Sequence, residues 1–168
     1  MMNPRSKSAD IREATILRRY HIQNREDYVA YERICGHITS LTAKLKTLKA
    51  DDKFRIEMTQ QLLTKLYDLG VIDSKSSLEK GEKISVSSFC RRRIPVVLVR
   101  NKMSQSMKEA VELVEQGQVR VGPNVVTDPA FLVTRTMEDF VTWVDSSKIR
   151  RTIAKYNNKL DDFELLEG

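Results

Sequence analysis

The densest positive charge in the sequence lies between residues 91 and 102. This segment, RRRIPVVLVRNK, carries five cations and no acid. Arginine suits phosphate because its planar guanidinium donates two parallel hydrogen bonds and sheds water more readily than an ammonium group. The alternative is a charged face that pairs with carboxylates from elsewhere in the chain. Since the segment holds no acid of its own, its composition favours binding to RNA phosphates. The cations are Arg91, Arg92, Arg93, Arg100 and Lys102.

The sequence predicts that these cations lie on one helix, which Ser88 is placed to cap. At 100° per residue, Arg93 and Arg100 are seven positions apart and point within about 20° of each other, so they would form a fork of guanidinium groups. Pro95 would kink this helix, because proline has no N–H and leaves a backbone carbonyl one turn earlier unpaired. A short strand is predicted just before the helix, over residues 83–87.

A second helix and a small hairpin of strands are predicted after the basic segment. The sequence SMKE at residues 106–109 is a capping box, and Gly117 is expected to end the helix. Residues 118–121 alternate polar and apolar, so their two valines face inwards while the glutamine and arginine face outwards. Residues 122–126, GPNVV, turn the chain and return it. Residues 140–144, FVTWV, are interpreted as the closing strand.

Two amphipathic helices are predicted before the basic segment. Asn24 can cap the first, and apolar residues recur along it in a heptad-like stripe with spacings of three and four. Asp51 and Asp52 interrupt this pattern, and a second helix runs from Phe54 to a stop at Gly70. An apolar stripe normally faces the protein's own core, although its remainder could dock a partner helix. The candidate protein-partner contacts on the stripe are Tyr31, Ile34, Ile38, Leu41 and Leu45.

The predicted fold class is α+β and mainly helical. We expect an N-terminal helical hairpin packed on a small module of two helices and a short antiparallel sheet, with a basic helix towards the C-terminal end. A chain of 168 residues suffices for one ordinary domain with appendages. The predicted divisions are a basic N-terminal arm over residues 1–23, the hairpin and a connector over 24–82, the RNA-binding module over 83–145, and a basic helix with an acidic tail over 146–168.

The two ends of the chain differ in charge. Residues 1–10 are polar and expected to be loose, whereas residues 11–20 put three arginines beside apolar side chains, which suits either an RNA-binding arm or a short docking helix. Residues 160–168 hold four acids and no cation, so the formal charge of +6 understates the basic face of the remaining chain. In the last predicted helix, the side chains expected to point inwards are Ile149, Ile153 and Tyr156.

The sequence offers little for catalysis or for metal binding. Cys35 and Cys90 are too few and too far apart for a disulfide framework or a zinc-ligand pair, so buried free thiols are expected. His21 and His37 are the only histidines and have no evident serine, cysteine or metal partner. No stretch approaches the roughly 18 apolar residues of a membrane span. We therefore expect no enzyme activity, no cofactor, no metal and no membrane association.

Residues 87–144 resemble the alpha-L RNA-binding motif, also called the S-four RNA-binding domain. This motif has an Arg-Arg-aliphatic helix, a serine-capped helix that ends in glycine, and an x-Val-x-Val strand with a turn. The hairpin upstream is similar to the helical part of the small-subunit ribosomal protein of the same family. Four segments are similar to a nucleolar branch of the family: YHIQNREDY at residues 20–28, CRRR at 90–93, VRVGPN at 119–124 and MEDFVTWVD at 137–145. The similarity covers roughly residues 16–163.

The resemblance implies an RNA-binding ribosome-biogenesis factor of the nucleus and nucleolus. It implies a place in the U3 small nucleolar ribonucleoprotein and the small-subunit processome, where the family binds U3 small nucleolar RNA and pre-rRNA and supports their pairing for early small-subunit rRNA processing. The implied protein partners are the M-phase phosphoprotein scaffold of the U3 particle and other small-subunit processome proteins. The alternatives are a structural small-subunit ribosomal protein and a protein-binding adaptor. The candidate RNA-binding residues are Arg91, Arg92, Arg93, Arg100, Lys102, Ser104, Gln118 and Arg120.

Overall fold

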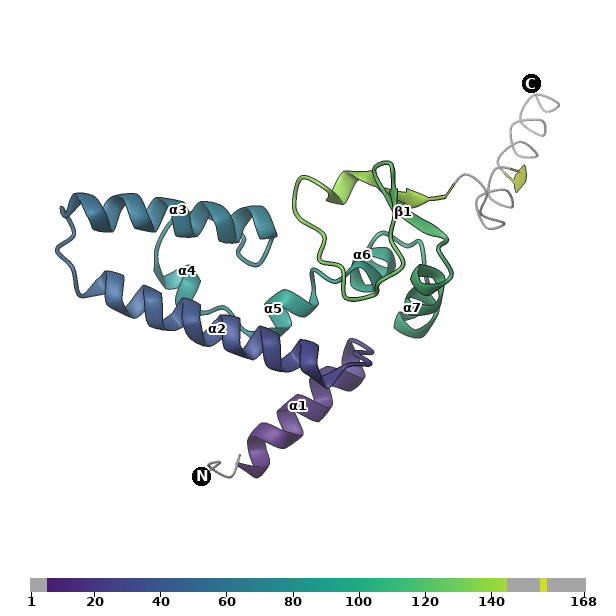
Figure 1. The fold of residues 1–168 in the computed structure, drawn as a ribbon, viewed down its shortest axis with the longest axis horizontal. Helices are drawn as coiled ribbons and strands as arrows, with labels where there is room; N and C mark the ends of the chain where they lie inside the picture. The colour runs from purple at the N-terminus through teal and green to yellow at the C-terminus, as the bar shows by residue number, and fades with distance from the viewer. Residues whose placement is uncertain (1–5, 145–154, 157–168) are drawn as a thin grey trace, which may run out of the picture.

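Helices and one small antiparallel sheet form the part of the chain that the structure describes, residues 6–144 and 155–156 (Figure 1). The structure is a computed structural model. Elements α1 to α5 form a helical N-terminal unit, and α6, α7 and the sheet form a smaller C-terminal unit. The elements are α1 (Lys7–Arg19), α2 (Arg25–Lys46), α3 (Lys53–Leu69), α4 (Glu79–Glu82), α5 (Val86–Cys90), α6 (Ile94–Arg100), α7 (Met107–Glu115), β1 (Val119–Val121), β2 (Asn124–Val125), the 3₁₀ helix η1 (Glu138–Phe140) and β3 (Val141–Trp143).

The N-terminal unit is organised around α2, which is 22 residues long. Ser6 caps α1, because its hydroxyl accepts a hydrogen bond from the Ala9 amide. Residues 7–10, expected to be loose, are therefore helical. Buried Glu13 joins α1 to the start of α2 by accepting hydrogen bonds from the Arg25 guanidinium. From the far end of α2, α3 returns in the opposite direction, and the predicted helical hairpin is present (Figure 1).

Each end of α3 has a capping residue, and of the two Gly70 is the one predicted from the sequence. The Asp52 carboxylate caps the first turn and accepts a hydrogen bond of 2.8 Å from the Phe54 amide. At the other end Gly70 has φ +81°, the left-handed conformation that glycine adopts without steric cost. The Gly70 amide donates to the Tyr67 carbonyl and the next amide donates to Leu66, which satisfies the last carbonyls of the helix.

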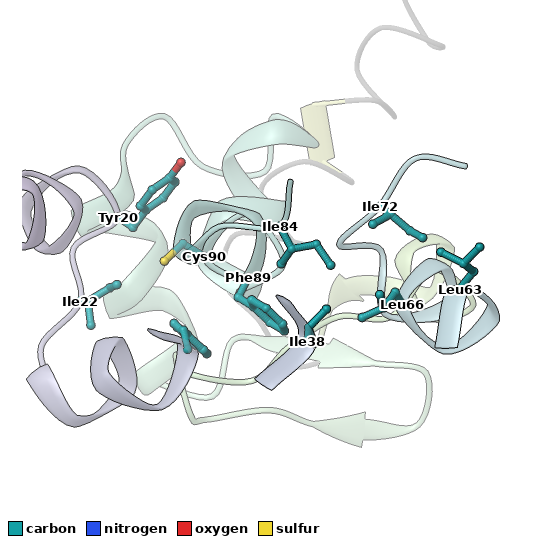
Figure 2. Packing of buried hydrophobic residues seen from close by; sticks show 10 residues of the cluster. Tyr20, Ile22, Ile38, Leu63, Leu66, Ile72, Ile84, Phe89 and Cys90 are labelled. Carbon is teal, nitrogen blue, oxygen red and sulfur yellow. The ribbon is translucent and has the colours of Figure 1, made fainter. Parts of the chain in front are cut away.

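The core of the N-terminal unit lies where α2, α3 and α5 meet. Figure 2 shows Phe89 of α5 beside Ile38 of α2, with Leu66 of α3 close by. The rings of Phe89 and Tyr31 stack with their centroids 5.7 Å apart. The short helices α4 and α5 pack against α2, and they supply part of the core that a two-helix hairpin lacks. The buried members of this cluster are Tyr20, Ile22, Tyr31, Ile38, Leu63, Leu66, Ile72, Ile84, Phe89 and Cys90.

The predicted basic helix is wrong, and so is the strand predicted before it. Residues 86–90 form α5, which begins with a reciprocal capping arrangement between Ser85 and Ser88. The chain then leaves the helical path, and α6 starts afresh with Arg93 as its N-cap and Pro95 in its first turn. Proline is favoured in a first turn because the amide it lacks would have no partner there. The fork of guanidinium groups expected on one continuous helix therefore does not form.

The C-terminal unit packs α6 and α7 against a sheet with strand order β2-β1-β3, antiparallel throughout. Val119 and Val121 point inwards as predicted. The closing strand is shorter than predicted, since Phe140 belongs to η1 and is exposed. The α+β, mainly helical fold class is confirmed. The buried residues of this core are Ile94, Val97, Leu98, Ala110, Val114, Val119, Val121, Val126, Val133 and Val141.

The helix predicted towards the C-terminal end falls mostly outside the described residues, and with it Ile149, Ile153 and the acidic tail. Tyr156 and its neighbour Lys155 are described and helical, but Tyr156 is 62% exposed, so its predicted inward orientation is wrong. Within residues 6–144 and 155–156, no helix combines the length and the apolar character needed to cross a membrane.

Candidate nucleic-acid interface

Arg92 lies inside the protein at the junction of the two units. Its Nε and Nη2 donate to the Val133 carbonyl at 3.0 and 2.7 Å, and its Nη1 donates to the Glu138 carboxylate. The Arg92 carbonyl in turn accepts a hydrogen bond of 2.8 Å from the Val133 amide. The side chain passes directly over Gly70, where an added Cβ would come within 2.5 Å of the guanidinium. Arg92 therefore connects the end of α3 to the loop before η1.

Arg93 is also buried, and its side chain connects the start of α6 to α2. Its Nη1 donates to Asp27 at 3.1 Å and to the Tyr31 hydroxyl at 3.0 Å. Burial disfavours the charged guanidinium, but Tyr31 and Asp27 together outweigh burial and raise the pKa of Arg93. The same burial raises the pKa of Tyr31, which stays a neutral hydroxyl. Arg93 is thus a charged tie between the units, with no surface left for a phosphate.

The acids that pair with the basic segment come from distant parts of the chain. Glu138 accepts hydrogen bonds from both Arg92 and Arg100, the latter at 2.7 Å. Burial alone would raise the pKa of Glu138, but the hydrogen bond from Arg92 and the charges of Arg92, Arg100 and Arg135 lower it. The inference that this segment lacks acidic partners is therefore wrong for Arg92, Arg93 and Arg100. The side chain of Arg100 is nevertheless 49% exposed, so it can also contact a ligand.

Arg91 and Lys102 are the predicted cations that stay fully available. Both side chains are exposed, and neither has an ion pair or hydrogen bond with any described residue. Lys102 follows α6 with φ +60°, a conformation uncommon outside glycine, which directs the chain away from the helix and towards α7. Arg100 and Lys102 therefore form an exposed cationic edge at the end of α6.

The three remaining predicted RNA contacts take structural positions. Ser104 is buried, and its hydroxyl donates to the Ser106 carbonyl at 3.0 Å. Gln118 is half-buried, and its main-chain carbonyl accepts a hydrogen bond from the Val144 amide, which extends the pairing of the sheet. Arg120 is also half-buried, and its Nη1 donates to the Gly122 carbonyl at 2.7 Å while its Nε donates to Trp143. The structure thus does not bring all eight predicted residues onto one surface.

The residues predicted to contact a protein partner also divide into buried and exposed side chains. Tyr31, Ile38 and Leu45 are buried in the protein's own core, as the more conservative interpretation of the stripe expects. Ile34 and Leu41, at the edge of the same stripe of α2, are 42% and 37% exposed. These two are the stripe residues that a partner helix can reach.

Arg135 is an important residue that sequence reasoning missed. Its Nε donates to the Tyr67 carbonyl at 2.8 Å and its Nη2 donates to the Ile72 carbonyl at 2.7 Å. The guanidinium also lies 4.2 Å from the centroid of the Tyr67 ring, a cation–π distance. No local pattern marks Arg135, because its partners are backbone carbonyls at the end of α3, more than 60 residues earlier.

The cysteines and histidines form no catalytic or metal site in the described residues. Burial raises the pKa of the Cys35 and Cys90 thiols to about 11, so both are unreactive at neutral pH. Cys90 is fully buried and Cys35 half-buried, in keeping with the expected free thiols. His37 is exposed on α2, and His21 sits in the turn between α1 and α2. No cluster of three or more potential metal ligands occurs in residues 6–144 and 155–156.

A helical N-terminal unit tied by arginines to a small α+β unit defines a protein of the ribosomal S4 class. Residues 2–91 match the family described as ribosomal protein S4/S9 N-terminal domain, and residues 92–139 match the S4 domain. The chain is 53% identical over 154 residues to the U3 small nucleolar ribonucleoprotein protein IMP3 of Saccharomyces cerevisiae, which covers 91% of this chain and 84% of the relative. It therefore belongs to the IMP3 family within this class.

Further relatives come from the same IMP3 family and from the uS4 ribosomal proteins. The human U3 small nucleolar ribonucleoprotein protein IMP3 is 52% identical over 156 residues, covering 93% of this chain and 85% of the relative. The small ribosomal subunit protein uS4 of Picrophilus torridus is 25% identical over 139 residues, covering 80% of this chain and 74% of the relative. These names describe ribonucleoprotein and ribosomal components rather than enzymes, which agrees with the expectation that this protein is not an enzyme.

Proposed function

We propose that this protein is an RNA-binding component of the U3 small nucleolar ribonucleoprotein and acts in ribosome biogenesis in the nucleolus. The observation that carries the proposal is the identity of more than half of the residues, over nine-tenths of the chain, to relatives named as U3 small nucleolar ribonucleoprotein proteins. The S4 domain supplies a module suited to RNA, and its exposed cationic edge at the end of α6 supplies the charge that phosphates need.

The finer part of the proposal concerns what the protein does with RNA. It binds U3 small nucleolar RNA and pre-rRNA and supports their pairing for early small-subunit rRNA processing. Exposed Arg91, Arg100 and Lys102 contact the phosphates, whereas buried Arg92 and Arg93 position the units that carry them. Phosphate contacts fix the position of an RNA without specifying its sequence, so the pairing of the two RNAs supplies the sequence recognition.

The experiment measures binding of a U3 RNA fragment by the full chain at several salt concentrations. Each lost phosphate contact lowers the slope of log affinity against log salt by about one unit. We expect Arg100→Ala with Lys102→Ala to lower both the slope and the affinity. The matched control is Arg33→Ala with Lys65→Ala, which removes the same charges from exposed positions on α2 and α3. Equal slopes for the two double variants would contradict the proposed surface.

The M-phase phosphoprotein scaffold of the U3 particle is the proposed protein partner, bound on the exposed side of α2. Ile34 and Leu41 present apolar surface there, about two turns apart on one face. We expect Ile34→Ser with Leu41→Ser to reduce capture of the scaffold in a pull-down. Phe54→Ser with Ile56→Ser, which removes exposed apolar side chains from the start of α3, is the control. Equal capture by both variants would show that the scaffold does not bind this face.

A structural protein of the mature small subunit is the second candidate, because the chain also resembles uS4 proteins. The two candidates differ in where the protein is found after the subunit is complete. An assembly factor sediments with precursor particles and is absent from mature cytoplasmic subunits. Recovery of the protein in stoichiometric amounts from mature subunits would favour the second candidate.

A further inference from the structure

A strongly cationic hollow of about 390 Å³ lies at the junction of the two units. One wall is the chain from the end of α3 to the start of α5, and the other wall comes from the C-terminal unit and the loop before η1. Both matched family regions therefore contribute to it. The cations that line the hollow are Lys80, Lys83, Arg91, Arg92, Arg100 and Arg135.

Little negative charge faces these six cations. The carboxylate among the lining residues is Asp73, which is exposed and pairs with Lys80 at 3.1 Å. That hydrogen bond from Lys80 lowers the pKa of Asp73, so the acid stays ionised and is committed to one lysine. Glu138, which is not among the lining residues, neutralises part of the charge of Arg92 and Arg100 through its ion pairs with both. Lys83 and Arg91 remain, exposed and without an ion pair or hydrogen bond to any described residue.

The floor of the hollow is rigid, whereas its rim can adapt. Arg92 and Arg135 are held by backbone carbonyls, and Arg135 also lies over the Tyr67 ring. Their charges are therefore in place before a ligand arrives, which reduces the entropy lost on binding. Lys83 and Arg91 also line the hollow, and we call them its rim because their side chains are exposed and can turn towards a ligand.

The chemistry of the lining selects an anion. Sites for apolar ligands are lined mainly by hydrophobic and aromatic side chains, whereas half of the residues named around this hollow are cationic. A tetrahedral phosphate accepts several charge-assisted hydrogen bonds at once and suits clustered guanidinium groups. Arg100 belongs both to the hollow and to the edge that continues to Lys102, so a chain of phosphates can pass from one to the other.

We propose that this hollow holds a backbone phosphate of bound RNA, so that one RNA strand contacts the N-terminal unit and the S4 domain together. The inference rests on the proposed RNA-binding function and assigns Lys80, Lys83 and Arg91 of the N-terminal unit to it. RNA fits better than an acidic peptide because the hollow is continuous with the cationic edge of the S4 domain.

The test measures the affinity of the full chain for a labelled single-stranded RNA by fluorescence anisotropy, at salt concentrations from about 50 to about 200 mM. Lys83→Ala with Arg91→Ala removes the two unpaired cations of the rim. For a single strand, each lost contact is expected to lower the salt slope by about 0.7 unit and to reduce affinity by about fivefold at about 0.1 M salt. Arg33→Ala with Lys65→Ala is the charge-matched control and should leave both unchanged. Lys83→Glu is a second variant, at an exposed turn position away from the core.

The outcomes separate this inference from the function on which it rests. If Lys102→Ala weakens RNA binding while both rim variants bind like the control, the hollow is not an RNA site and Arg91 is not a phosphate contact, but the proposed RNA binding through Arg100 and Lys102 stands. If the unchanged protein binds RNA without salt dependence, both fail. A Glu-rich peptide is the competing probe. Loss of peptide binding in the rim variants, with RNA binding retained, would assign the hollow to an acidic protein segment and overturn the inference.

Discussion

Replacement of Gly70 by alanine tests whether Arg92 holds the two units together. Gly70 has φ +81°, and the added Cβ would lie 2.5 Å from both Cζ and Nε of Arg92. Such a distance is too short for non-bonded atoms, so the guanidinium must move. Because the guanidinium is buried and bonded to Val133 and Glu138, its movement breaks those bonds.

The expected cost has two parts that a control can separate. Left-handed backbone costs an alanine about 1–2 kcal/mol. Displacing a buried charge from its partners adds up to about 3–5 kcal/mol, reduced here because Glu138 is partly exposed and keeps Arg100. We expect Gly70→Ala to lower the free energy of unfolding by about 3–5 kcal/mol in total. Gly122→Ala is the control, since Gly122 has φ +57° and no atom within 4 Å of the added Cβ.

Urea unfolding, followed by circular dichroism, measures both variants. Gly122→Ala should cost about 1–2 kcal/mol, which is the backbone part alone. In an Arg92→Met background, the cost of Gly70→Ala should fall to the same value, because the group that blocks the methyl has gone. Equal destabilisation by Gly70→Ala and Gly122→Ala in the natural sequence would refute the role assigned to Arg92.

Three further predictions concern single groups. Because Arg92 and its neighbours lower the pKa of Glu138 below its ordinary value of 4.5, Glu138 stabilises the fold above that pH and loses this effect as pH falls through its folded pKa. Glu138→Gln should therefore lower the unfolding free energy at pH 7, with the gap between the two proteins closing as pH falls below 4.5 and through the folded pKa of Glu138; a pH-independent gap would contradict this. Iodoacetamide should label Cys90 at pH 8 about 100-fold more slowly in the folded than in the urea-unfolded chain, and equal rates would show that the thiol is accessible. Ser106→Ala should cost about 1 kcal/mol in thermal or urea unfolding because the Glu109 amide loses its cap, and an unchanged midpoint would exclude that role.

The elements with local signals could be predicted from the sequence. The start of α7 is set by Ser106 and the end of α3 by Gly70, and each signal acts within one helical turn. In the capping box, the serine half is present, but the Glu109 carboxylate accepts from the Gln105 amide instead of the Ser106 amide. The valine hairpin was predictable because Val119 and Val121 alternate with polar residues.

The break between α5 and α6 could not be predicted because a proline at position 95 is compatible with either a kinked helix or the start of a new one. Proline inside a helix kinks it, whereas proline in a first turn is favoured, and the neighbouring sequence does not separate these cases. The structure resolves the choice through tertiary contacts, since the Ile94 amide donates to the Phe131 carbonyl and Arg93 bridges to Leu132. A helix running through this point would lose these contacts.

The candidate site was the least predictable part, because charge in a sequence does not reveal its partners. Arg93 meets Asp27 across 66 residues, and Arg92 meets Glu138 across 46. A local count of acids around the basic segment could not include either one. Sequence reasoning therefore identified a region rich in cations but could not tell the buried ties from the exposed Arg91 and Lys102.

The two neighbouring arginines of the junction also differ in when they can form their contacts during synthesis. Asp27 precedes Arg93 in the chain, so this tie can form once α6 begins to emerge from the ribosome. Arg92 must wait for Glu138, which is made 46 residues later, or about 2–9 s at usual rates of translation. During that interval the N-terminal unit already has Phe89 for its core, while Arg92 remains a solvated charge. The last step in closing the junction is therefore set by residues from the far end of the S4 domain.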